Sequence, residues 1–363
     1  MRGEPLAPCS WKGGITYLAM DAVGSLRTPL VRANFAYFTR CLQTIPYWIC
    51  NETTDIPACY FWNKERAAKG SDEILSILIH YLDQPAHKRG SEHLFIEADG
   101  CGGQLWNYTA VALLNDMTHP QSTTWVTDTG KPWFIRADMV RSRVGHTFML
   151  PDRMQGALSR AGNKEESVAD IHAWMALAKK MNAAGGKVEV TEVPAACPFI
   201  MKVGGYLGQY YHIGKKTALT GEMAAIRNAH WINFGAGPDE TGKMVSHPGE
   251  VWFRDSYDIA SPIRKVNYCR NIKAKTVDGI KRYVERAPWN EYFGDDEDIK
   301  PLSAFQKYDE AVTLEDALIK DLHKLSMSGL PSHQRHLYPI PEGCVCRECV
   351  EFQKENPQGC ECE

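Results

Sequence analysis

The stretch "FIEADGCGGQLWNY" occupies residues 95–108 and joins an apolar run to a Gly-rich turn through Asp99. Apolar and β-branched residues before the acid predict a buried strand over 92–99. A carboxylate at the end of a buried strand costs free energy unless a positive group neutralises it, and no basic residue adjoins Asp99. Divalent cations bind carboxylate oxygens readily. We therefore expect Asp99 to be a metal ligand.

Two further acids lie in comparable settings. Asp21 interrupts the apolar strand pattern of residues 14–23, and Asp152 lies at the head of a helix that follows a strand predicted over 131–140. Acids from a first strand, a later strand and the next helix can converge at one sheet edge. Such a cluster would repel itself without cations, and two Mg²⁺ or Mn²⁺ ions would make it a clamp for phosphoryl transfer. The alternative is that each Asp is a turn or cap residue.

The remaining periodicity predicts an α/β fold, a mixed sheet flanked by helices. Because no helix separates the first three strand regions, we expect the first strands to be antiparallel. Ser71 is the expected cap of the first helix. The other expected elements are strands over 34–52, 58–63 and 187–193 and helices over 72–84, 103–117, 153–160 and 165–182.

Five blocks follow in order along the chain: "LAMDAVGSLRTP", "AYFTRCL", "WNKERAAKGSDEILSILIHYL", "FIEADGCGGQLWNY" and "VGHTFMLPDR". Together they resemble the transposase-derived, ribonuclease H-like integrase domain of eukaryotic transposon proteins, over about residues 14 to 270. The resemblance implies a ribonuclease H-like sheet and a catalytic, metal-binding triad of Asp21, Asp99 and Asp152. It also implies that His146 and Arg153 bracket the third acid, that transposon-end DNA is the partner, and that the protein is nuclear. His146 is a further catalytic candidate, which could donate to a phosphate oxygen or orient a carboxylate, with a histidine packed in a turn as the alternative.

The sequence departs from the family pattern in two places. "DAVGSL" lacks the amide usual after the first Asp, and Leu105 and Trp106 replace a basic residue after Gln104. We expect a core over 14–200, an irregular C-terminal extension over 201–330 that includes a basic segment at 264–286, and a Cys-rich tail over 331–363.

Several polar and basic side chains are candidate nucleic-acid contacts. Gln104 and Asn107 lie one turn apart on the helix expected there, with helix capping and packing as the alternative. The arginines around the third acid could form a phosphate-binding rim or simply be solvated, and the basic segment could contact a DNA backbone or form an exposed amphipathic helix. The full set of candidates is Gln104, Asn107, Arg136, Arg141, Arg143, Arg153, Arg264, Lys265, Arg270, Lys273 and Lys275.

The C-terminal tail contains five closely spaced cysteines. Cys346 and Cys349 have the C-x-x-C spacing of zinc knuckles, Cys360 and Cys362 can complete four thiolates, and Cys344 is a spare ligand. The sequence predicts a Zn²⁺ site separate from the carboxylates, because thiolates and carboxylates select different metals. A redox-exposed tail without metal is the alternative.

Charge and hydropathy limit the classes of function. The 363-residue chain has a net charge of −3, which argues against coating nucleic acid by bulk charge alone. No apolar stretch reaches the roughly 18 residues of a membrane span, so we expect a soluble intracellular protein. The predicted function is metal-dependent phosphodiester hydrolysis or strand transfer on DNA. A ribonuclease H-like nuclease and an inactive copy that binds nucleic acid or protein are the alternatives, and a homo-oligomer is left open.

Overall fold

The structure is a computed structural model. It describes residues 14–22, 24–31, 41–64, 67–84, 87, 91–122, 124–142, 149–183, 186–194, 196–209, 211, 225–258, 260–267, 272–277, 280–285, 300–308, 316–331, 334 and 337.

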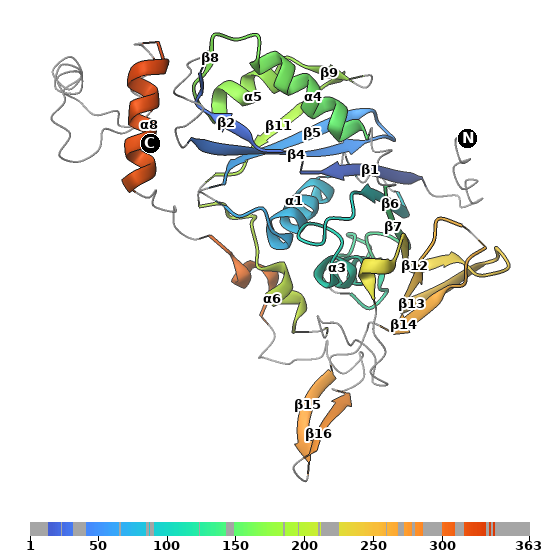
Figure 1. Ribbon diagram of the computed structural model, residues 1–363. Coiled ribbons are helices and arrows are strands. Elements are labelled where there is room, and N and C mark those ends of the chain that lie inside the picture. The colour runs from blue at the N-terminus through green and yellow to red at the C-terminus, as the bar shows by residue number, and fades with distance from the viewer. Residues whose placement is uncertain are drawn as a thin grey trace.

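A large mixed sheet forms the centre of the molecule (Figure 1). Its strands lie in the order β11-β5-β4-β1-β6-β7-β12-β13-β14, and β2 pairs with β4 beside this path. The strands are β1 (Ile15–Asp21), β2 (Leu26–Thr28), β4 (Leu42–Asn51), β5 (Ile56–Asn63), β6 (His93–Ala98), β7 (Arg136–Arg141), β11 (Glu189–Glu192), β12 (Trp231–Pro238), β13 (Met244–Arg254) and β14 (Arg264–Asn267).

The direction of the strands agrees with the sequence-based expectation. β1 and β4 are antiparallel, as are β4 and β5, so the early strands form a meander. β6 then pairs with β1, and β7 with β6, in parallel. The carboxyl ends of β1, β6 and β7 therefore lie at one edge of the sheet, which confirms the mixed α/β prediction in its coarse form.

Helices cover both faces of the sheet (Figure 1). One face packs against α1 (Ser71–Asp83) and α3 (Tyr108–Thr118), and the other against α4 (Leu150–Gly162) and α5 (Ile171–Lys179). Strand alternation explains the division: Leu18 and Met20 belong to the core beneath α1 and α3, whereas Ala19 belongs to the core beneath α4 and α5.

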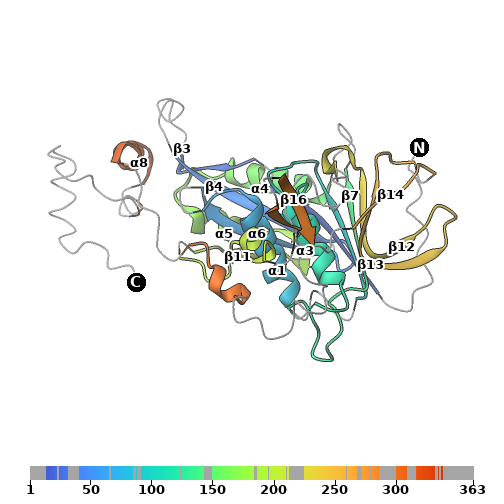
Figure 2. The same ribbon diagram turned by 90° about the horizontal axis from the view of Figure 1, so that it is seen from below.

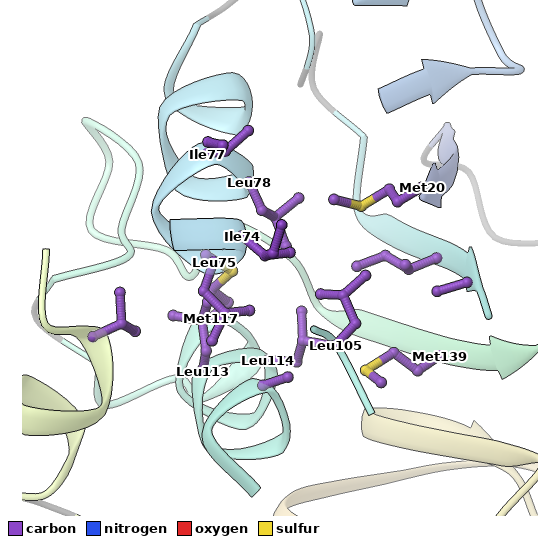
Figure 3. Close-up of a cluster of buried hydrophobic side chains, with 14 of the residues drawn as sticks. Met20, Ile74, Leu75, Ile77, Leu78, Leu105, Leu113, Leu114, Met117 and Met139 are labelled. Carbon is purple, nitrogen blue, oxygen red and sulfur yellow. The ribbon is translucent and has the colours of Figure 1, made fainter. Parts of the chain in front are cut away.

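The larger core lies between α1, α3 and the sheet (Figure 3). Ile74 and Leu78 project from one face of α1 toward Met20 on β1, and all three side chains are at most 1% exposed. Full burial of one such side chain contributes about 1.5–3 kcal/mol. This packing holds the carboxyl ends of β1 and β6 against the helix layer.

Three strands beyond residue 230 extend the same sheet. β12 pairs antiparallel with β7, and β13 and β14 follow it. A buried polar network supports this extension, because Asp138 on β7 accepts hydrogen bonds from Trp231 and Asn233 on β12, at 2.8 Å each. The sheet therefore continues past residue 200, where the sequence suggested that the core ends.

Other elements are short or peripheral. The helix α8 and the strands β12 to β14 lie at opposite ends of the molecule in both views (Figures 1 and 2). Every helix among the described residues is too short or too polar to cross a bilayer. The peripheral elements are β3 (Leu30–Val31), β8 (Ser167–Val168), β9 (Asn182–Ala183), β10 (Gly186–Lys187), α6 (Val203–Leu207), η2 (Ile226–Asn228), β15 (Ile272–Val277), β16 (Ile280–Glu285), η3 (Leu302–Phe305) and α8 (Asp316–Gly329).

Two local expectations were wrong, and one alternative does not match the described residues. Helix α1 is capped at Gly70, whose N–H donates to the Glu73 carboxylate, instead of at Ser71. Helix α3 begins at Tyr108, five residues later than expected, because the Asn107 side chain caps it. The described parts of the basic segment form β14 and the hairpin β15–β16 in place of an amphipathic helix.

Candidate functional site

The three predicted acids come from the elements that the sequence suggested. Asp21 is the last residue of β1, Asp99 follows β6 directly, and Asp152 lies in the first turn of α4. Met20 and Ala98 are register partners on the parallel strands β1 and β6. Asp21 and Asp99 are each one residue further along and so leave neighbouring strands at the same level. All three Asp residues are half-buried.

Electrostatic coupling shows that the three carboxylates converge. The pKa of Asp21 is raised from 3.8 to about 7, first by burial and then by the negative charges of Asp99 and Asp152. The pKa of Asp152 is also raised, by burial and by Asp99. One carboxylate raises the pKa of another when the two charges lie near each other in a medium of low dielectric. The cluster therefore carries negative charge that is incompletely compensated.

Each acid also has a local structural contact. Asp99 Oδ1 accepts a hydrogen bond from the backbone N–H of Cys101 at 3.0 Å, which stabilises the turn. Asp152 occupies the helix N-terminus, where a negative charge is favoured. However, its Oδ2 atom is buried and has no hydrogen-bond partner among the described residues. These local roles do not explain why the three carboxylates meet.

Two cationic side chains border the acids. Lys69, in the segment before α1, donates a hydrogen bond to the carbonyl oxygen of Ala22, and its charge lowers the pKa of Asp21. Arg141, the last residue of β7, is attracted to Asp99. Lys69 was not among the sequence-based candidates; its only signal was a lysine in the turn that precedes the first helix.

Tyr47 on β4 is a second group that the sequence did not single out. Its side chain is fully buried, and its hydroxyl has no hydrogen-bond partner among the described residues. Burial raises its pKa, and Asp21 and Asp99 raise it further. A hydroxyl beside two carboxylates is a potential donor to them or to a bound water. In the sequence, Tyr47 looks like one more aromatic core residue in "IPYWIC".

The two amide candidates lie in the turn and the cap that precede α3. Asn107 Oδ1 accepts from the N–H of Ala110 and from the Ser71 hydroxyl, and its Nδ2 donates to the carbonyl of Gln104. Gln104 lies in the turn before α3 and is 8% exposed. The two residues therefore do not share a helix face, and Asn107 fits the capping alternative.

The arginine and lysine candidates are dispersed. Arg136 is buried and its Nε donates to Asp138 at 2.6 Å, so it faces a structural carboxylate. Arg153 is exposed on α4. Arg264 forms two hydrogen bonds with Asp255, and Lys265 is exposed over the ring of Trp252. These side chains do not form one continuous rim.

Several candidates lie outside the described residues. These are His146, Arg143, Arg270 and the tail cysteines Cys344, Cys346, Cys349, Cys360 and Cys362. For Lys273 and Lys275 the structure describes the backbone alone, as part of β15. The zinc prediction therefore stays a prediction.

The donor chemistry of the acid cluster suits hard divalent cations. Carboxylate oxygens are the ligands that Mg²⁺ and Mn²⁺ prefer. A bound cation would give the buried Asp152 Oδ2 atom a partner and would reduce the mutual repulsion of the acids. In the described part of the chain, no three His, Cys, Asp or Glu side chains are close enough to hold one ion.

Comparison of the chain with protein-family profiles, with curated proteins and with solved structures gave no match.

Proposed function

We propose that this protein is a ribonuclease H-like, transposon-derived domain that cleaves or transfers DNA phosphodiesters with bound Mg²⁺ or Mn²⁺. The observation that carries the proposal is the electrostatic coupling of Asp21, Asp99 and Asp152: burial, together with the charges of Asp99 and Asp152, raises the pKa of Asp21 to about 7. A buried cluster of like charges is costly and is typical of functional sites.

The architecture supports the proposal. The meander of β1, β4 and β5 precedes the parallel pairs β1–β6 and β6–β7, and the acids follow the strand ends at one edge. The resemblance implies a mixed sheet of this kind, with antiparallel strands first and acids delivered in this order.

The side chains of this site have separable roles. Asp21, Asp99 and Asp152 supply the anionic oxygens, and Lys69 offsets part of their charge through its position beside Asp21. When bound, the metal ions activate the attacking oxygen and stabilise the leaving oxygen. The Tyr47 hydroxyl lies within electrostatic range of Asp21 and Asp99 and can orient either carboxylate or a water.

The test is DNA cleavage by the wild type and by Asp99→Asn. Supercoiled plasmid and end-labelled duplex DNA are incubated with Mg²⁺, with Mn²⁺ or with a chelator. We expect cleavage that requires the metal and falls at least 100-fold in Asp99→Asn, because the amide preserves the shape but removes the charge. Asp128→Asn is the matched control, since Asp128 is exposed on a loop. Equal activity of Asp99→Asn and wild type would refute the role of the acids.

The products separate the alternatives. Joined strands identify a transposase or integrase, and cut strands alone identify a nuclease. DNA binding without any product, under all metal conditions, identifies the inactive copy. The departures at "DAVGSL" and at Leu105 and Trp106 bear on strand transfer more than on the fold, so the joined product is the outcome that they make least expected.

A further inference from the structure

We propose that Arg141 binds a backbone phosphate of the nucleic acid at the acid cluster, and that Trp106 and Gly100 hold its guanidinium ready for that contact. This inference rests on the proposed function and assigns one specific contact within it. It distinguishes Arg141 from the other arginines that the sequence offered.

The position of Arg141 follows from the sheet. Arg141 ends β7 and is the register partner of Ala98 on β6, the residue before Asp99. Because β6 and β7 are parallel, Arg141 and Asp99 leave the same edge of the sheet. Asp99 attracts the guanidinium, yet no ion pair joins these two described residues. Arg141 therefore lies beside the acids, and its guanidinium is not occupied by an ion pair with Asp99.

The guanidinium is held from two sides. Its central carbon lies 4.9 Å from the ring centroid of Trp106, a cation–π arrangement. Trp106 is 3% exposed and its indole N–H donates to the carbonyl of Ile226 at 2.8 Å, so the platform is itself fixed. On the other side, a Cβ at residue 100 would lie 2.8 Å from Arg141 Nε. Glycine at this position leaves the space that the guanidinium occupies.

One nitrogen of the Arg141 guanidinium lacks a hydrogen-bond acceptor among the described residues. Its Nε is buried and has no hydrogen-bond partner among the described residues. Burial lowers the pKa of Arg141, whereas Tyr257 and Asp99 raise it, so the charged form sits in a partly desolvated place. A buried donor without a partner is costly, and such a group in a native structure calls for an explanation.

A phosphate oxygen is the partner that fits this chemistry. Arginine presents a planar fork of N–H donors that matches phosphate geometry, and stacking on an aromatic ring orients that fork. If one oxygen of a phosphodiester faced the metal-binding carboxylates, another of its oxygens would be within reach of the Arg141 guanidinium beside Asp99. Free phosphate shares this chemistry, and the experiment separates the two sources.

The test measures binding without catalysis. The affinity of a short fluorescein-labelled duplex is measured by anisotropy with Ca²⁺ or with a chelator, for the wild type, Arg141→Gln and Arg141→Lys. We expect a loss on the order of tenfold for Arg141→Gln, and a smaller loss for Arg141→Lys, which keeps the charge but not the fork. Arg160→Gln is the control, because Arg160 is exposed on α4. Thermal unfolding verifies that each variant folds.

A neutral methylphosphonate, placed at one phosphate after another, gives the decisive readout. For the wild type we expect one position where neutralisation weakens binding, and we expect Arg141→Gln to be insensitive at that position. If Arg141 only positions Asp99, both proteins will respond alike, and the proposal is wrong. If inorganic phosphate stabilises the wild type but not Arg141→Gln while DNA binding is equal, the site takes a free anion and the nucleic-acid assignment fails.

These outcomes are separate from those for the proposed function. Equal cleavage by Asp99→Asn and wild type would overturn the metal chemistry, while the methylphosphonate result would still locate a phosphate at Arg141. A wild type that binds no DNA overturns both.

Discussion

Asp21 and Asp99 leave adjacent parallel strands at the same level, because the residues before them, Met20 and Ala98, are register partners. This relationship brings together two carboxylates that are 78 positions apart in the numbering, 99 minus 21. Asp152 joins them from α4, and its charge adds to the rise in the pKa of Asp21. The predictions below test what this arrangement does to stability, metal binding and DNA binding.

The charge on Asp21 should make stability depend on pH. Its folded-state pKa of about 7 lies above the ordinary 3.8, so the folded protein binds this proton more tightly than the unfolded chain does. The stability that protonated Asp21 contributes to the folded state is fully present below about pH 4 and is lost as the pH rises through about 7. In a chelator at pH 8, we expect Asp21→Asn to be roughly 1–3 kcal/mol more stable than the wild type, allowing for partial solvent screening.

At pH 4.5 the advantage of Asp21→Asn should fall to roughly a quarter of its value at pH 8, because this pH lies well below the folded-state pKa of about 7 and only slightly above the ordinary 3.8. Urea unfolding at the two pH values measures both differences. Asp128→Asn, on an exposed loop, is expected to show no such pH dependence. An Asp21→Asn variant that is less stable than the wild type at pH 8 would contradict the proposed repulsion.

Divalent cations should reverse this destabilisation. A ligand that binds only the folded state adds about 1.4 kcal/mol when its free concentration is tenfold above Kd. We therefore expect Mg²⁺ or Mn²⁺ to raise the melting temperature of the wild type at pH 8 and to raise that of Asp21→Asn and Asp99→Asn much less. Differential scanning fluorimetry gives the comparison. Equal shifts in all three proteins would place the ions elsewhere.

The size of residue 100 should control DNA binding through Arg141. A Cβ at Gly100 would lie 2.8 Å from Arg141 Nε and 3.1 Å from its Cδ, so Gly100→Ala must displace the guanidinium from Trp106. We expect Gly100→Ala to lose DNA affinity nearly as much as Arg141→Gln does, with a change in stability below about 1 kcal/mol. Anisotropy and urea unfolding measure the two effects.

Gly103→Ala is the matched control, because a Cβ at residue 103 would meet nothing within 4 Å. Its DNA affinity should equal that of the wild type. Loss of affinity in Gly103→Ala as well would show that the whole turn, and not the space beside Arg141, determines binding.

The buried Asp138 should be essential for the extended sheet. It is 0% exposed and accepts hydrogen bonds from His93 and Arg136 at 2.6 Å each, and also from Trp231 and Asn233. Burial would raise its pKa, but the charge of Arg136 and the contacts with His93 lower it overall. Asp138→Asn removes the buried negative charge that Arg136 and His93 contact, so we expect a loss of about 3–5 kcal/mol in unfolding free energy.

Asp255→Asn is the comparison for Asp138, because it removes an exposed ion pair with Arg264. We expect Asp255→Asn to change the free energy of unfolding by less than about 1 kcal/mol. A small effect for Asp138→Asn would mean that β12 and β13 unfold independently of β6 and β7. Urea unfolding followed by tryptophan fluorescence is suitable, since Trp231 contacts Asp138 directly.

The spacing of apolar residues along the chain was sufficient to predict many of the strands and helices. Alternation in β1, the helical spacing of Ile74, Leu75 and Leu78 in α1, and the apolar run of β6 all identified elements that the structure contains. The start of α3 was mispredicted because Gln104 and Asn107 have helical spacing, whereas the Asn107 side chain instead caps the helix. The strand β12 was missed because nearly all of its residues are buried, on both faces, and so show no clear alternation, and the same holds for the last four residues of β13.

The sequence by itself determined most of the strands and helices before residue 200 and marked three acids in apolar or Gly-rich settings, because these properties depend on residues close together in the chain. Only the tertiary structure decided which polar groups act together. Asp21 acquires its raised pKa from burial and from the charges of Asp99 and Asp152, and Arg141 is held in place by Trp106 beside Gly100. Burial and charge coupling depend on distance in space, which the register of β1, β6 and β7 sets.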